Sequence, residues 1–170
     1  TPRTVIVACV VQDGHAWWMH VGDCRLYLVR EGRIVARTRD HTVVQQLIDQ
    51  GRIREEAIAS HPERNRLLQC LGGYLAPSLE SAERARLAKG DVLLLCSDGF
   101  WGPLTQRQML HALLSRSLDR AMLPAVAALG DRRPWWQAVL WLRTDGRLWR
   151  EEGASTAPTG GISIGGNVGS

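Results

Sequence analysis

Short hydrophobic stretches bounded by turn residues fill the first quarter of the chain. Residues 5–11 are continuously apolar and rich in β-branched side chains, which predicts a central β-strand. Asp13-Gly14 follows and is a strong hairpin signal. Three further strands are expected at residues 16–21, 24–30 and 33–38. Four short strands joined by tight turns predict an antiparallel meander.

The hydrophobic pattern then changes to a helical period. Thr42 and Gln45 have the spacing of a capping box, and Gly51 is a suitable helix end. A later helix would be capped by Thr105 and have one apolar face made by Met109, Leu110, Leu113 and Leu114. Helices are expected at residues 43–50, 54–60, 105–118 and 120–129.

Three more strands complete the expected layout, at residues 81–87, 92–96 and 137–143. Lys89-Gly90-Asp91 has the chemistry of a hairpin between the first two of them. Strands and helix pairs in this order predict an α+β fold in which helices cover antiparallel sheets.

Residues 90–101 contain the strongest candidate for a metal-binding carboxylate in the sequence. Its five apolar residues 92–96 predict a strand buried on both faces, and Ser97-Asp98-Gly99 follows directly. A carboxylate at the mouth of a buried strand suits a hard divalent cation, which prefers oxygen ligands. The alternative is that Asp98 only caps the turn.

Composition narrows the function classes. The chain has 170 residues with 45% hydrophobic and 22% charged residues, typical of one soluble domain, and no apolar run is long enough for a membrane span. The 21 basic residues are scattered, which disfavours nucleic-acid binding. The four cysteines form no C-x-x-C pair, which indicates buried, reduced thiols and a cytoplasmic protein. We expect a domain over residues 1–150 and a disordered tail over 151–170.

Four segments, taken in order, resemble one family. They are His20-Val-Gly-Asp-Cys-Arg-Leu-Tyr-Leu28, Thr38-Arg-Asp-His-Thr42, Asn65-Arg-Leu-Leu-Gln-Cys-Leu-Gly72 and Asp91-Val-Leu-Leu-Leu-Cys-Ser-Asp-Gly99. They are similar to the V-G-D-S-R-x-Y, T-x-D-H-S, N-x-L-x-x-x-L-G and D-x-L-L-L-C-S-D-G motifs of bacterial PP2C-type (PPM) metal-dependent protein serine/threonine phosphatases. The resemblance covers residues 4–129, with Cys24 where serine is usual.

This resemblance implies a sandwich of two antiparallel β-sheets flanked by helix pairs, incomplete in this chain. It also implies a binuclear Mn²⁺ or Mg²⁺ centre at one end of the sandwich. Family members hydrolyse phosphoserine and phosphothreonine with a metal-activated water, so they need no protein nucleophile. The partner implied is a phosphoprotein, a target of a bacterial Ser/Thr kinase in signal transduction, and the enzyme is expected to be a monomer.

Carried over by motif, Asp98 matches the metal-bridging aspartate. Asp23 matches the aspartate that in some members helps hold a third, weaker metal; the alternative is a hairpin-turn carboxylate that organises Arg25. Asp40 and His41 are expected to fix the loop into the first helix, with His41 as proton donor the minor alternative. His15, His20, His61 and His111 are interpreted as surface or structural residues because their spacing forms no ligand set.

Two departures from the family pattern limit this interpretation. Nothing corresponds to the family's early metal-linked acid, phosphate-binding arginine or D-G-x-G-G motif, so the chain looks N-terminally truncated. Pro134 and Trp135 occupy the positions of a late Asp-Asn, and Asp131 is the nearest substitute. We therefore expect weak Mn²⁺ binding and little activity. A non-catalytic phosphatase-like module that binds a phosphoprotein is the second hypothesis, and an unrelated α+β binding domain is the third.

Overall fold

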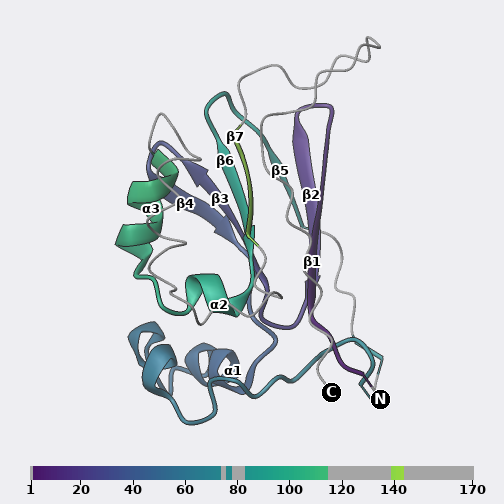
Figure 1. The fold of residues 1–170 in the computed structure, drawn as a ribbon, viewed down its shortest axis with the longest axis vertical. Coiled ribbons are helices and arrows are strands. Elements are labelled where there is room, and N and C mark those ends of the chain that lie inside the picture. The colour runs from purple at the N-terminus through teal and green to yellow at the C-terminus, as the bar shows by residue number, and fades with distance from the viewer. Residues whose placement is uncertain (1, 74–75, 78–82, 115–138, 144–170) are drawn as a thin grey trace.

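The computed structural model describes residues 2–73, 76–77, 83–114 and 139–143, which form two antiparallel sheets (Figure 1). One sheet has the order β1-β2-β5 and consists of β1 (Ile6–Gln12), β2 (His15–Val21) and β5 (Glu83–Arg86). The other has the order β4-β3-β6-β7 and consists of β3 (Arg25–Arg30), β4 (Arg33–Arg37), β6 (Val92–Cys96) and β7 (Val139–Arg143). The expected pair of antiparallel sheets is confirmed.

The space between the sheets holds one of two hydrophobic clusters. Successive side chains of a strand point to opposite faces, so every second residue enters this space. Leu26 and Leu28 of β3 and Leu93 of β6 meet Ala16 and Trp18 of β2 there. Val7, Cys9 and Val11 of β1 pack against the same cluster.

The other cluster lies between the four-stranded sheet and two helices, α2 (Asp98–Trp101) and α3 (Gln106–Leu114). Tyr27 and Val29 of β3 are buried here, as are Phe100 of α2 and Met109 and Leu113 of α3. β3 and β6 are thus covered on both faces. This explains why residues 92–96 form an unbroken apolar run, as the sequence indicates.

The expectation that residues 5–11 form a central strand is wrong for the described part of the chain. β1 lies at the edge of its sheet and pairs only with β2. Its inner residues pack on the core, while Ile6 and Val10 are 43% and 59% exposed. A continuous apolar run does not reveal that one of its faces is uncovered.

The predicted meander and one predicted hairpin are also wrong. β1–β2 and β3–β4 are hairpins, but they belong to different sheets, and the linker between β2 and β3 changes sheet. β5 pairs with β2, whereas β6 pairs with β3, so Lys89-Gly90-Asp91 joins the two sheets and makes no hairpin. Turn residues mark where a strand ends, and burial decides which sheet the next strand joins.

The helices begin where the capping signals placed them. The side chain of Thr42 accepts a hydrogen bond from the backbone N–H of Gln45 and caps α1 (Val43–Asp49). The segment predicted at 54–60 is a 3₁₀ helix, η1 (Glu55–Ser60). Thr105 accepts a hydrogen bond from the N–H of Gln108 at the start of α3. The predictions for 115–118, 120–129, 131–135 and 151–170 lie outside the described residues.

Strand β7 confirms the predicted closing strand at its C-terminal five residues, pairing with β6. No helix in the described part of the chain is long and apolar enough to cross a membrane. The N-terminal end of β3 and the C-terminal end of β6 lie together at one end of the sandwich, next to α2 (Figure 1).

Candidate functional site

Asp23 and Asp98 are brought together by the register of two strands. In the antiparallel β3–β6 pair, Arg25 lies opposite Cys96. Asp23 precedes Arg25 by two residues and Asp98 follows Cys96 by two, so both carboxylates leave the same end of the strand pair. The two motifs that the sequence singled out separately therefore form one acidic site.

The pKa of Asp23 reflects its acidic surroundings. Burial, followed by the negative charges of Asp98 and Asp40, raises this pKa to about 6. Arg25 acts in the opposite sense with a smaller effect. Asp98 is exposed, and one of its carboxylate oxygens accepts the N–H of Gly99 at 2.8 Å. A bound cation would relieve the repulsion between the two carboxylates.

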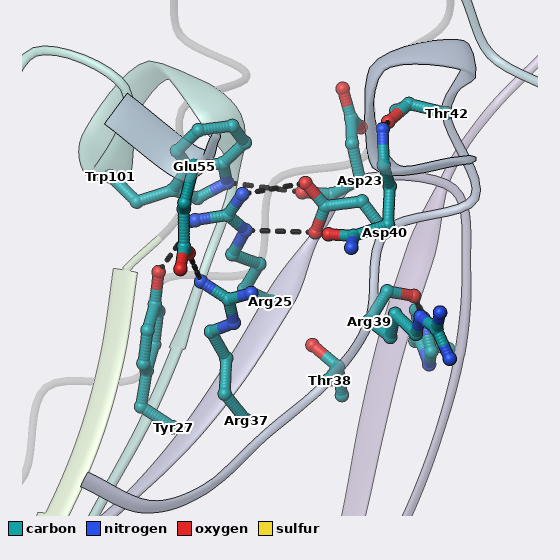
Figure 2. A network of polar contacts seen from close by, with 12 residues as sticks. Asp23, Arg25, Tyr27, Arg37, Thr38, Arg39, Asp40, Thr42, Glu55 and Trp101 are labelled. Carbon is teal, nitrogen blue, oxygen red and sulfur yellow. Dashed lines mark hydrogen bonds and ion pairs between the residues drawn. The ribbon is translucent and has the colours of Figure 1, made fainter. Parts of the chain in front are cut away.

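Arg25 is fixed by Asp40, which corrects the alternative in which Asp23 organises Arg25. Its Nε and Nη2 donate to the two carboxylate oxygens of Asp40 at 2.8 and 2.6 Å, and Nη1 donates to the Tyr27 hydroxyl at 3.0 Å (Figure 2). The pair is buried, with Arg25 4% and Asp40 7% exposed. Burial lowers the pKa of Arg25, but its bonds to Asp40 more than offset this and raise the pKa above its usual value.

Trp101 is the residue that sequence reasoning missed. The guanidinium carbon of Arg25 lies 3.4 Å from the centre of the Trp101 ring, and the indole Nε1 donates to the backbone carbonyl of Asp23 at 3.0 Å. Figure 2 shows the Arg25 guanidinium between the indole and Asp40. No local signal announces these contacts, because their partners lie on strands far apart in sequence. The position of Trp101, three residues after Asp98, is the nearest hint.

His41, in the loop into α1 that Asp40 and His41 were expected to fix, joins this loop to the linker between the sheets. Its Nδ1 accepts the N–H of Gly22 at 3.3 Å, and its backbone N–H donates to the carbonyl of Gly22. The His20 ring stacks on His41 at 4.4 Å. A role for His41 as proton donor stays a prediction. His15 and His61 make local hydrogen bonds, and His111 lies exposed on α3.

The four cysteines are free, but the expectation that all of them are buried is wrong, because only Cys96 is buried. Cys24, in the place of the usual serine, adjoins the acidic site. Burial raises the pKa of its thiol to about 12, and Asp23, Asp98 and Asp40 add to the rise. The thiol is therefore un-ionised at neutral pH and is a poor metal ligand or nucleophile in that state.

The residues present fit part of a metal centre. Within the described ranges, no group of three or more His, Cys, Asp and Glu side chains is placed to hold a metal ion. The two opposed carboxylates offer oxygen ligands of the type that Mn²⁺ and Mg²⁺ prefer. Beside them, the buried hydroxyl of Ser97 has no hydrogen-bond partner in the described part of the chain. These groups can supply some of the ligands that a binuclear site needs.

Comparison with known proteins assigns this two-sheet fold to a family, the bacterial PP2C-type Ser/Thr phosphatases. The serine/threonine phosphatase PstP of Mycobacterium tuberculosis is 37% identical over 110 residues, which are 65% of this chain and 21% of PstP. The structure of the Streptococcus agalactiae serine/threonine phosphatase superposes with a TM-score of 0.67 at 30% identity, covering 76% of this chain and 54% of that one.

A second solved structure, again of PstP, contains metal ions. The catalytic domain of PstP in complex with two manganese ions superposes with a TM-score of 0.64 at 27% identity, covering 75% of this chain and 52% of that chain. No protein-family model matches. This chain is homologous to bacterial PP2C-type Ser/Thr phosphatases and has their fold. It spans about half the length of the phosphatase structures it matches.

Proposed function

We propose that this chain contributes part of a Mn²⁺ or Mg²⁺ centre that hydrolyses phosphoserine and phosphothreonine in proteins. The observation that supports this proposal is the opposition of Asp23 and Asp98 at one end of the β3–β6 pair. Asp98 would be the metal-bridging ligand, and Asp23 would help hold a more weakly bound cation. When bound, the metals would activate water and offset the charge that develops on the phosphoryl oxygens.

The chain's own residues would orient this centre. Arg25, held by Asp40, and Trp101, bonded to the Asp23 carbonyl, keep the linker and the Asp98 turn in place. No protein nucleophile is required in such a mechanism, and the un-ionised thiol of Cys24 would take no part in it. The substrate would be a phosphoprotein, a target of a bacterial Ser/Thr kinase, and we expect a cytoplasmic monomer.

We expect this chain by itself to bind Mn²⁺ weakly and to have little activity. A pair of divalent cations needs several oxygen ligands between them, and the described residues bring together only two carboxylates. The same observation favours the alternative, a non-catalytic phosphatase-like module that binds a phosphoprotein. Cys24 in place of serine favours it as well.

Calorimetric titration with Mn²⁺ tests the proposal. We expect weak binding that is lost in Asp98→Ala and retained in Asp13→Ala, a matched control that removes an exposed turn carboxylate. Hydrolysis of p-nitrophenyl phosphate should be low and should depend on Mn²⁺ and on Asp98. Binding that is equal in both variants would refute the assignment of Asp98. Binding of a phosphoserine peptide without Mn²⁺, together with no hydrolysis, would establish the module instead.

A further inference from the structure

We propose that Trp101 is a positioning residue that fixes the Asp23 linker against the Asp98 turn and so sets the separation of the two carboxylates. We call the hydrogen bond from the Trp101 indole to the Asp23 carbonyl the tie. Its geometry is independent of any metal, and its consequence for Mn²⁺ binding rests on the proposed function.

One end of the tie is rigid because Trp101 and Asp98 share a single helical turn. The backbone N–H of Trp101 donates to the carbonyl of Ser97 at 3.3 Å, and the N–H of Gly102 donates to the carbonyl of Asp98 at 2.7 Å. Phe100, between the two residues, is fully buried in the cluster under α2. The backbone from which the Trp101 side chain extends is therefore fixed relative to the backbone of Asp98.

The other end of the tie is the backbone of the linker. The indole N–H donates to the carbonyl of Asp23 at 3.0 Å, so it holds the main chain from which the Asp23 carboxylate projects. The carboxylate itself stays available to a ligand. An indole N–H can donate but cannot accept, so this bond fixes the direction in which the ring edge points.

Arg25 packs against one face of the Trp101 ring. Its guanidinium lies 3.4 Å from the ring centre and is itself held by two hydrogen bonds to Asp40 and one to Tyr27. A cation over an indole face is the most favourable of the cation–π arrangements. The chain Asp40–Arg25–Trp101–Asp23 thus connects the loop before α1 to the linker and to α2 (Figure 2).

The direction of the Trp101 side chain is set by a specific contact. Its indole N–H points at the backbone carbonyl of Asp23, and Arg25 lies over its ring. Packing alone would bury the Trp101 ring without directing its N–H at the Asp23 carbonyl. The hydrogen bond is the feature that distinguishes positioning from packing.

Trp101→Phe tests the hydrogen bond while an aromatic ring remains under Arg25. The primary readout is the backbone ¹³C carbonyl resonance of Asp23 in the full chain without metal. This resonance should shift in Trp101→Phe, because the carbonyl loses the hydrogen bond from the indole. Trp17→Phe, on strand β2, is the matched control and should leave the resonance unchanged.

The second readout is Mn²⁺ affinity, which should fall about tenfold in Trp101→Phe, equivalent to about 1.4 kcal/mol and within the range of one hydrogen bond. An unshifted Asp23 carbonyl resonance in Trp101→Phe overturns the positioning role, as does the same shift in Trp17→Phe. A shift in Trp101→Phe together with no Mn²⁺ binding to the wild type counts against the proposed function alone. If Trp101→Phe does not fold, hydrogen exchange of the Trp101 indole in the wild type decides, and exchange as fast as in the unfolded chain overturns the proposal.

Discussion

Asp23 and Asp98 leave the same end of the β3–β6 strand pair, each two residues beyond the last paired residues, Arg25 and Cys96. Each belongs to a separate motif, and the strand register alone makes them neighbours. The resulting repulsion is a cost to the folded protein in the absence of a cation. This cost makes the site measurable without any assay of activity.

The pH dependence of stability should reveal this cost. The pKa of Asp23 is raised from an ordinary value near 3.8 to about 6, first by burial and then by Asp98 and Asp40. The folded state therefore holds a proton that the unfolded state releases, so stability should fall as pH rises from about 4 to above 6. Asp23→Asn should remove this fall and stabilise the metal-free protein at pH 7.5 by on the order of 1–3 kcal/mol.

Urea unfolding at pH 4.5 and pH 7.5 measures the effect. Asp13→Asn, in the exposed β1–β2 turn, is the control and should change stability equally at both pH values. Added Mn²⁺ should act in the opposite direction, because the cation requires an ionised Asp23 and binds better at the higher pH. A pH profile in which Asp23→Asn and the wild type run parallel would show that the pKa is not raised.

The buried ion pair between Arg25 and Asp40 should contribute far more to the free energy of unfolding than an exposed pair does. Asp40→Ala leaves the Arg25 guanidinium buried without its bidentate partner and should cost about 3–5 kcal/mol of unfolding free energy. Arg39→Ala breaks an exposed pair with Asp49 and should cost about 0–1 kcal/mol. Urea denaturation compares the two variants. Equal losses would mean that Asp40 does not anchor Arg25.

Replacement of Gly22, in the linker between the two sheets, should destabilise the folded protein. Its φ is +100°, and an added Cβ would lie 2.2 Å from Val5 Cγ1. Gly22→Ala should cost about 1–2 kcal/mol for the left-handed backbone and about 1–3 kcal/mol more for the clash. Gly51 has a φ of +67°, and an added Cβ there would meet no atom within 4 Å. Gly51→Ala should therefore show only the cost of the left-handed backbone.

Thermal unfolding of both glycine variants separates these costs. Adding Val5→Ala to Gly22→Ala should recover part of the second cost, because it removes Val5 Cγ1, although Val5 Cβ stays 2.6 Å from the added Cβ. No recovery in the double variant would mean that the clash is relieved elsewhere.

Cys24 should be slow to react with thiol reagents. Burial raises its pKa to about 12, with further contributions from Asp23, Asp98 and Asp40, so almost no thiolate exists at pH 8. Alkylation by iodoacetamide, followed by mass spectrometry, should be much slower for Cys24 in the folded chain than in urea. Asp98→Ala should speed it, because one of the charges that oppose ionisation is removed. Equal rates in folded and unfolded chains would contradict the raised pKa.

The sequence predicted the strands and helix starts well where the signal is local. Thr42 caps α1 as its spacing with Gln45 indicated, and the apolar run before Ser97 is a strand buried on both faces. The predicted strand pairing was wrong where two distant segments compete for the same partner strand. The residues after β2 and before β6 read as hairpin turns, yet both cross between sheets.

The sequence by itself determined the described strands and the starts of α1 and α3, and that a carboxylate follows a buried strand at Asp98, but it did not predict α2. Turn and capping residues act on backbone within a few positions, so their effect can be read locally. Only the tertiary structure decided that Asp23 faces Asp98, that Arg25 pairs with Asp40, and that Trp101 holds the linker. These contacts depend on strand register and on burial between distant segments, which local spacing does not specify.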